Sequence, residues 1–168
     1  IGEKMTATDN LHDKRSQQIQ AITSHLRVLF KSIQQHSKRV EKECGLTSAM
    51  LWMMWELFAT PGMKVSQLAN ALSIHASTCS NMLDKLESKG LVERRRSGPD
   101  QRAVHLLITD KGSTLLAKAP RPAQGAMSGA LEKLADKDLN KLGQGLKVLI
   151  DSLQAKDEDA EFKPIFDE

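Results

Sequence analysis

Four arginines lie close together near the middle of the chain, at Arg94, Arg95, Arg96 and Arg102. A guanidinium group presents its hydrogen-bond donors in a planar fork that matches the oxygens of a phosphate. A cluster of this kind can therefore bind the backbone of a nucleic acid. Two other interpretations are a solvated charged face and a charged strand edge that prevents pairing between molecules. The net charge is only +3 and does not decide between them.

A second polar set precedes the arginines on a predicted helix, residues 76–89. The apolar positions of this helix are expected to face the core, and they are Ala76, Cys79, Leu83 and Leu86. Helical spacing then places short polar or basic residues on the opposite side: Ser77, Thr78, Asn81 and Lys85. Such side chains suit base edges and phosphates in a major groove. Taken alone, the same pattern describes a helix exterior in water.

The elements around these residues predict a helix-turn-helix followed by a hairpin. Apolar intervals of three and four indicate two short helices that are joined through Ser73-Ile74-His75. After Gly90 the apolar period changes to two, which predicts a hairpin over residues 91–108 with its turn at Ser97-Gly98-Pro99-Asp100. A basic hairpin directly after a helix-turn-helix is a wing. This combination favours duplex DNA over a generic helical bundle.

Alternation along the hairpin sends Arg94 and Arg96 to one face and Arg95 to the other. Arg102 lies near the tip, where a guanidinium can enter the minor groove. Because phosphate would repel Asp100, we expect this residue to pair with an arginine and hold the shape of the tip. The full set expected at the DNA is Ser77, Thr78, Asn81, Lys85, Arg94, Arg95, Arg96, Asp100 and Arg102.

A long amphipathic helix precedes the helix-turn-helix. Apolar side chains recur every three or four positions from Ile19 to Val40, which predicts a helix from about Leu11 to Cys44. Thr47 is a suitable cap for a following helix over residues 48–60.

Helical patterning returns after the hairpin, at Thr109-Asp110. Pro120 and Pro122 predict a kink or a break soon afterwards. Asp136 is a candidate cap for a last helix, whose leucine stripe continues to Leu153. The apolar stripes of the first and last helices exceed what one subunit can cover, so we expect a homodimer.

The predicted fold class is mainly α with a small β-hairpin wing: a winged helix-turn-helix domain plus N- and C-terminal helices that form a dimerisation domain. We assign residues 46–109 to the winged domain, and residues 11–45 and 110–155 to the dimerisation helices. Residues 1–10 are expected to combine a cloning remnant, ahead of a natural start at Met5, with a disordered N-terminus. Residues 156–168 are expected to form an acidic mobile tail, with docking through Phe162, Ile165 and Phe166 as the alternative.

Other classes of protein find little support. The chain has no glycine-rich phosphate loop, nucleophile elbow or metal quartet, so we expect neither an enzyme nor a cofactor. The five histidines show no ligand spacing, and no metal site is expected. No apolar run approaches the roughly 20 residues that span a bilayer. Without such a run or a signal-peptide core, we expect no membrane partner and a cytoplasmic location.

Four consecutive apolar residues, Trp52 to Trp55, cannot all face one core. Tryptophan and methionine make adaptable walls for a flat apolar ligand, although a filled core and dimer seam explain them too. The hypothesis is that an aromatic acid or phenol binds near Trp52 and weakens DNA binding. The ligand residues expected on this hypothesis are Arg15, His25, Arg27, Leu29, Ser32, His36, Trp52, Met53 and Trp55.

Two cysteines offer an alternative form of control. Oxidation of Cys79 would add bulk beneath the polar helix, and Cys44 lies at a helix end. A redox-responsive regulator using Cys79 or Cys44 is thus one alternative, set against Cys79 as a small buried apolar residue. A second alternative is a winged helix that binds proteins, because such folds also serve as assembly modules.

Several strings resemble the MarR family (multiple antibiotic resistance regulators). They are Ser66-Gln67-Leu68-Ala69, Leu83-Asp84-Lys85-Leu86-Glu87-Ser88-Lys89-Gly90-Leu91-Val92-Glu93-Arg94, Asp100-Gln101-Arg102 and Leu107-Ile108-Thr109-Asp110-Lys111-Gly112. The resemblance implies a triangular homodimer that binds pseudo-palindromic DNA, usually as a repressor. It also implies release by a small anionic aromatic compound between the dimerisation helices and the winged domain. Pro120 and Pro122 depart from the family pattern.

Overall fold

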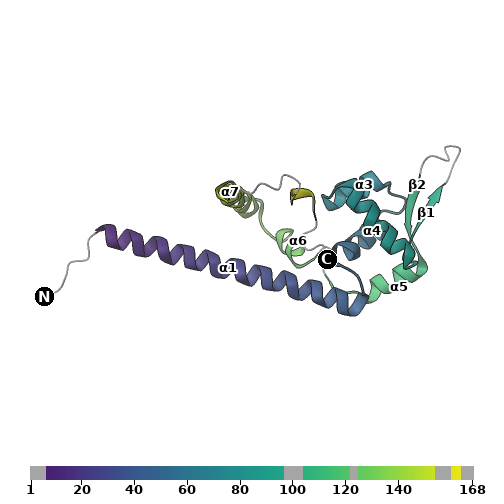
Figure 1. The fold of residues 1–168 in the computed structure, drawn as a ribbon, viewed down its shortest axis with the longest axis horizontal. Coiled ribbons are helices and arrows are strands. Elements are labelled where there is room, and N and C mark those ends of the chain that lie inside the picture. Colours follow the sequence, from purple (N-terminus) through teal and green to yellow (C-terminus); the bar gives the residue numbers. More distant parts are fainter. Residues whose placement is uncertain (1–6, 97–103, 122–124, 154–159, 164–168) are drawn as a thin grey trace.

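The computed structural model describes residues 7–96, 104–121, 125–153 and 160–163. It is mainly helical with one antiparallel hairpin, which confirms the expected fold class (Figure 1). The elements are α1 (Ala7–Cys44), α2 (Ser48–Ala59), α3 (Val65–Leu72), α4 (Ala76–Ser88), β1 (Val92–Arg96), β2 (Val104–Ile108), α5 (Asp110–Lys118), α6 (Ala126–Leu131), α7 (Asp136–Ser152) and the 3₁₀ turn η1 (Ala160–Phe162). No helix in these ranges is both long and apolar enough to cross a membrane.

The core lies around α2, which contacts α1, α3, α4, α5 and β2. Its side chains Leu51, Met53, Met54 and Leu57 are fully buried. Burying each such side chain contributes roughly 1.5–3 kcal/mol. Thr47 caps α2 as expected, because its hydroxyl oxygen accepts from the backbone N–H of Met50 at 3.2 Å. The core thus holds the helix-turn-helix and the hairpin as one unit at the C-terminal end of α1 (Figure 1).

A left-handed residue makes the turn between α3 and α4. Ser73 has φ 54° and ψ 44°, and the backbone N–H of Ile74 donates to the carbonyl of Ala69 at 3.0 Å. Ile74 is buried, so the turn is anchored in the core. The result is the expected helix-turn-helix with only three residues between the helices.

The hairpin gains a short third partner. Strands β1 and β2 pair in the register Val92↔Ile108 to Arg96↔Val104. On the other side of β2, Gly62 donates to the carbonyl of Leu106 and Leu106 donates to the carbonyl of Met63, both at 2.9 Å. The segment between α2 and α3 is therefore hydrogen-bonded to the base of the wing.

The start of α5 packs tightly against the end of α4. Thr109 caps α5 by accepting from the N–H of Gly112 at 3.0 Å, and its hydroxyl donates to the carbonyl of Gly90 at 2.8 Å. A Cβ atom added to Gly112 would lie 2.2 Å from the carbonyl oxygen of Leu91. Glycine is needed here for this close approach between α5 and the chain that leaves α4.

The first and last long helices leave large apolar side chains in solvent. On α1, Ile22 is 54% exposed and Phe30 is 52% exposed. No residue of α7 is buried, although Leu142 and Leu146 belong to an apolar stripe along it. Within the described ranges, these stripes have no partner that covers them.

The structure corrects several expected boundaries. Helix α1 begins at Ala7 rather than Leu11, so part of the expected disordered segment 1–10 is helical. Of the kink or break expected near Pro120 and Pro122, the structure shows a break in the helix: α5 ends at Lys118, and Pro120 is buried. Asp136 is the first residue of α7 and not its cap, a position that Ala135 takes without a side-chain bond.

The expected tail, residues 156–168, is in part structured. Residues 160–162 form η1, which lies against the start of α4: the N–H of His75 donates to the carbonyl of Phe162 at 3.2 Å. Mobility is therefore wrong for these residues, and the alternative, docking through Phe162, is what the structure shows. Residues 1–6, 154–159 and 164–168 lie outside the described residues.

Candidate nucleic-acid interface

Helix α4 carries an exposed polar line. Ser77, Asn81 and Lys85 follow one another at intervals of four residues and are all exposed, with Thr78 half-buried beside them. The opposite face is buried through Cys79, Met82, Leu83 and Leu86. Ala76 is exposed, which corrects the expectation that it faces the core, because it is the first residue of the helix at the open end of the turn. The polar line therefore lies on the surface as predicted.

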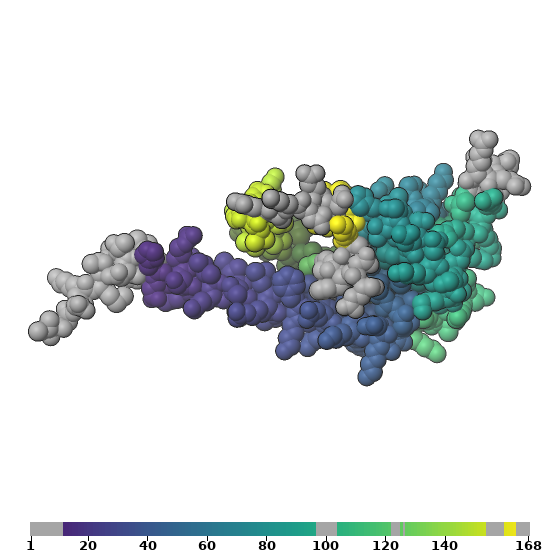
Figure 2. All heavy atoms as spheres, viewed as in Figure 1, coloured from purple at the N-terminus to yellow at the C-terminus, as the bar shows by residue number. Residues whose placement is uncertain are grey.

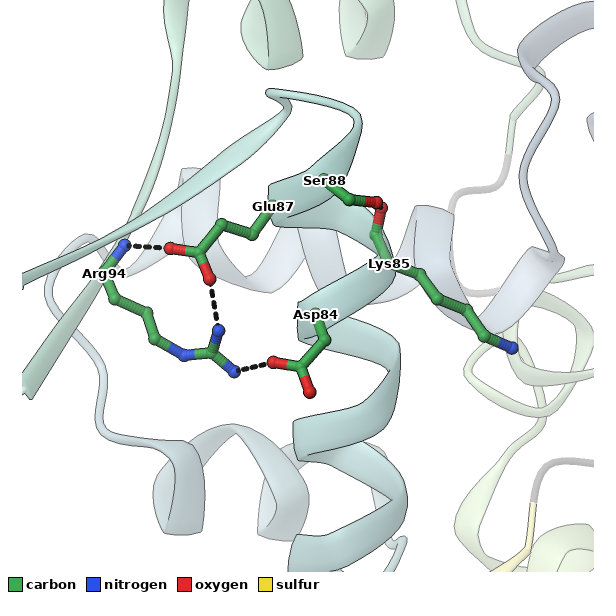
Figure 3. Close-up of polar contacts among 5 residues, drawn as sticks. All are labelled: Asp84, Lys85, Glu87, Ser88 and Arg94. Atoms are coloured by element: carbon green, nitrogen blue, oxygen red, sulfur yellow. Dashed lines mark hydrogen bonds and ion pairs between the residues drawn. The ribbon is translucent and has the colours of Figure 1, made fainter.

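Arg94 joins the hairpin to α4 (Figure 3). Its Nη2 donates to Oδ1 of Asp84 at 2.7 Å, its Nη1 donates to Oε2 of Glu87, and its backbone N–H donates to Oε1 of Glu87 at 3.3 Å. Burial alone would lower the pKa of Arg94, but the two carboxylates outweigh it and raise that pKa. The guanidinium is therefore charged and held in place by two residues of α4.

This pairing changes the role expected for Arg94. As a member of the arginine cluster it was expected at the DNA, whereas its guanidinium is bound within the subunit because β1 runs directly beside α4. Asp84 and Glu87 were not among the expected site residues. Their spacing of three on a helix, just before an arginine-rich strand, is the signal that could have identified them. Figure 3 shows Lys85 on the other side of α4, pointing away from this group.

The remaining wing residues differ in their surroundings. Arg95 pairs with Glu93 at 2.5 Å and keeps an exposed side chain, and Arg96 is exposed at the end of β1. Both side chains are thus on the surface of the hairpin. Asp100 and Arg102, on which the tip hypothesis depends, lie outside the described residues.

The cysteines sit in unreactive surroundings. Burial raises the pKa of Cys79 to about 11, although Arg94 acts in the opposite direction. Burial also raises the pKa of Cys44, and Glu43 adds to the effect. A thiol reacts as its thiolate, so both changes lower reactivity at neutral pH. Among the described residues, no three His, Cys, Asp or Glu side chains come together in a way that could hold a metal ion.

A cavity of about 600 Å³ opens where α1, the start of α2 and the end of α4 meet. Three lysines line it, Lys38, Lys85 and Lys89, against one acid, Glu41. The remaining polar residues of the wall are Gln34, Ser37, Thr47, Ser48 and Ser88. This lining suits an anion with hydroxyl or carboxylate groups.

The ligand residues expected from the sequence do not line this cavity. On α1, Arg15, His25, Arg27, Leu29 and Ser32 are exposed, and His36 is half-buried with an unpaired Nε2. Met53 is fully buried in the core, so it presents no surface to a ligand.

The two tryptophans occupy the edge of the core, because Met53 and Met54 fill the space inside it. Trp52 donates from Nε1 to Glu56 at 2.8 Å. Trp55 stacks on Phe58 and carries the Arg121 guanidinium 4.2 Å above its ring. The consecutive apolar residues therefore divide between core and edge, as their spacing required. Whether the tryptophans contact a ligand stays a prediction.

Known proteins are similar to this chain in sequence and in fold. The MarR family profile matches residues 46–104. The HTH-type transcriptional repressor MdtR of Bacillus subtilis (strain 168) is 27% identical over 114 residues, which are 68% of this chain and 74% of that protein. The organic hydroperoxide resistance transcriptional regulator of the same organism is 31% identical over 106 residues, 63% of this chain and 69% of that regulator.

A solved structure gives a third comparison. The transcriptional repressor CouR, bound to a 23-mer DNA duplex, is 28% identical with a TM-score of 0.53, covering 76% of this chain and 89% of that one. The family profile, the sequence relatives and the solved structure all point to one family. The chain therefore belongs to the MarR family of winged-helix transcription regulators.

Proposed function

We propose that this chain binds double-stranded DNA as a homodimer in the cytoplasm and represses transcription. Helix α4 enters the major groove through Ser77, Thr78, Asn81 and Lys85, and the hairpin reaches the minor groove. The observation that carries the proposal is the exposed polar line of α4 beside a hairpin that Arg94 fixes to the same helix. Because α4 and the basic hairpin are fixed relative to each other, they can contact the major and the minor groove at the same time.

The start of α4 supports phosphate binding. Ser77 and Thr78 lie in its first turn, where the backbone N–H groups and the helix dipole favour negative charge. Arg95 and Arg96 extend the basic surface along β1. Phosphate contacts of this kind position the protein, whereas Asn81 can read the edge of an adenine.

A dimer follows from the uncovered apolar stripes of α1 and α7. We assign residues 11–45 and 110–155 to dimerisation and residues 46–109 to DNA binding. Two copies related by a two-fold axis would place two α4 helices about one helical turn of DNA apart, roughly 34 Å. The proposed operator is therefore an inverted repeat.

Selection from a pool of random 40-base-pair duplexes tests the DNA proposal. The expected product is an inverted repeat, bound with an affinity that falls steeply between about 50 and 200 mM salt. Retention of no duplex at the lowest salt would overturn it.

Sedimentation tests the dimer separately. Leu146→Glu, in the α7 stripe, is expected to give monomers, whereas Val148→Glu, on another side of that helix, leaves the dimer intact. A monomeric wild-type chain at micromolar concentration would contradict the assignment.

We further propose that a small aromatic acid or phenol releases the DNA. The lysine-lined cavity supports this, because Lys85 belongs both to its wall and to the polar line of α4. A bound carboxylate would draw Lys85 away from phosphate. Titrating aromatic acids and phenols, while following tryptophan fluorescence and operator binding, is the test.

Two variants locate the effector. Loss of the response in Lys38→Ala assigns it to the cavity, and loss in Trp52→Phe assigns it to the site expected from sequence. No response across a broad panel would end the effector proposal and leave the DNA proposal standing.

A further inference from the structure

A short C-terminal segment rests on the start of α4. The turn η1, Ala160–Phe162, places the ring of Phe162 5.0 Å from the ring of His75, with the planes tilted by 44°. The backbone N–H of His75 donates to the carbonyl of Phe162 at 3.2 Å. In Figure 2 the yellow spheres of this segment touch the surface where α3 and α4 meet.

The contact is small enough to open. No residue of η1 is buried, and Phe162 remains 40% exposed. Among the described residues, η1 meets α4 through a ring contact and a backbone hydrogen bond at His75 and takes no part in the buried core, so the segment can leave without disturbing that core. His75 is the residue that precedes α4, and it holds η1 by its backbone as well as by its ring.

The segment has the charge of a competitor for phosphate. Among the twelve residues from Asp157 to Glu168, six are acidic and one is basic. Glu161 lies in η1 itself and is exposed. The first turn of α4, with Ser77 and Thr78, begins immediately after His75. A negative segment at this place is favoured by the same helix end that would favour a DNA phosphate.

We propose that the start of α4 is a docking surface for η1 of this chain, and that docking competes with DNA. This inference rests on the proposed function, because it requires α4 to be the helix that approaches the duplex. Phe162 anchors the segment on His75, and the carboxylate of Glu161 in η1 adds negative charge that repels a DNA phosphate approaching the same helix end. DNA then binds to the fraction of molecules in which η1 has left, so the apparent affinity is reduced by that fraction.

Hydrogen exchange of the full-length chain tests the docking without any DNA. In Phe162→Ala the amide of His75 is expected to exchange faster than in wild type, while the amides of buried α2 residues such as Leu51 keep their rates. Phe58→Ala, which removes a phenylalanine that is 50% exposed on α2, is the matched control. Equal exchange of His75 in wild type and Phe162→Ala would overturn the docking.

Fluorescence anisotropy with a labelled 40-base-pair duplex tests the competition. Phe162→Ala is expected to bind about fivefold or more tightly than wild type. A synthetic peptide of residues 154–168, added to this variant, is expected to reverse the gain, and the same peptide carrying Phe162→Ala is not. Unchanged or weaker DNA binding by Phe162→Ala would overturn the competition.

The two readouts separate this proposal from the function on which it rests. Failure of wild type and variant alike to bind any duplex would overturn the proposed function and the competition together. In that case the exchange of His75 still decides whether α4 holds the segment. Normal DNA binding by both proteins with equal affinity would leave the function standing and end the competition.

Discussion

Nη2 of Arg94 on β1 donates to Oδ1 of Asp84 on α4 across 2.7 Å, and the same guanidinium bonds to Glu87 one turn further along that helix. The side chain of Arg94 is only 25% exposed in this position. Arg94 therefore holds α4 and the hairpin together, while little of its own side chain is accessible to a binding partner.

Replacing Arg94 distinguishes a structural role, in which it holds the hairpin against α4, from a direct contact with phosphate. Arg94→Ala is expected to lower the free energy of unfolding by about 1 kcal/mol, because the exposed carboxylates limit the value of each pair. Its DNA affinity should fall while the dependence of log K on log salt keeps its slope, since no phosphate contact is lost. Arg94→Lys keeps the positive charge but cannot bond to both carboxylates in the same way. Its stability and DNA affinity should therefore lie between those of wild type and Arg94→Ala. A shallower salt slope in Arg94→Ala would show that Arg94 contacts phosphate after all.

Arg96 gives the opposite pattern. It is exposed at the end of β1, so Arg96→Ala should leave stability unchanged and weaken DNA binding. The salt slope should decrease by about 0.9 for one lost phosphate contact. Arg39→Ala, on α1 and paired with Glu43, is the matched control and should change neither value. Equal slopes for Arg96→Ala and wild type would remove Arg96 from the interface.

Asn81 is expected to carry sequence preference. An asparagine amide can make two hydrogen bonds to adenine, so Asn81→Ala should cost roughly 1–3 kcal/mol on the selected operator. Binding to unrelated duplexes at low salt should change little. Asn70→Ala on α3, also an exposed asparagine, serves as the control. An equal loss on operator and unrelated DNA would contradict a reading role for Asn81.

Gly112 is expected to tolerate no side chain. A methyl group there meets the carbonyl oxygen of Leu91 at 2.2 Å and Cγ1 of Ile108 at 2.7 Å, so backbone must move. Gly112→Ala should destabilise the chain by about 1–3 kcal/mol in urea unfolding. Gly143→Ala on α7 has open space around it and should be neutral or raise stability by up to about 1 kcal/mol. Equal unfolding midpoints for the two variants would refute the close approach.

Cys79 should resist modification while the protein is folded. Its pKa of about 11 keeps the thiol protonated, so iodoacetamide at pH 8 should label it only on unfolding, as mass spectrometry can follow. The unfolded thiol ionises near its ordinary pKa of 9.0. The stabilisation from the buried neutral thiol is therefore complete below pH 9 and is lost as the pH rises to about 11. Cys79→Ala should lose less stability over that window. Rapid labelling of Cys79 in folded protein would reopen a redox role.

Periodicity was sufficient to predict the winged unit. Apolar residues recur every three or four positions before Gly90 and every second position after it. This change predicted both α4 and the hairpin, because burial in one core imposes those spacings. The exposed positions of Ser77, Asn81 and Lys85 followed from the same geometry. What a surface residue touches on another element does not follow from periodicity.

The misses have this cause in common. Asp84 and Glu87 look like solvent positions on a helical wheel, yet β1 brings Arg94 against them. The close approach of Leu91 to Gly112 was not expected, because the two residues belong to different elements. Docking of Phe162 was an alternative without a partner, because His75, which it contacts, is far away along the chain. Each depends on a contact between elements that local spacing does not encode.

The pairing of Gly62 and Met63 with Leu106 has a mechanical consequence. Helix α2 ends at Ala59, so only two residues separate it from a backbone that is bonded to the wing. The lysine-lined cavity lies at the other end of the same helix, beside Thr47 and Ser48. If a ligand in the cavity tilted α2, the short connection would make the hairpin move with the opposite end of that helix. In a two-fold dimer, such a tilt alters the separation of the two wings and so the spacing of half-sites that both can reach at once.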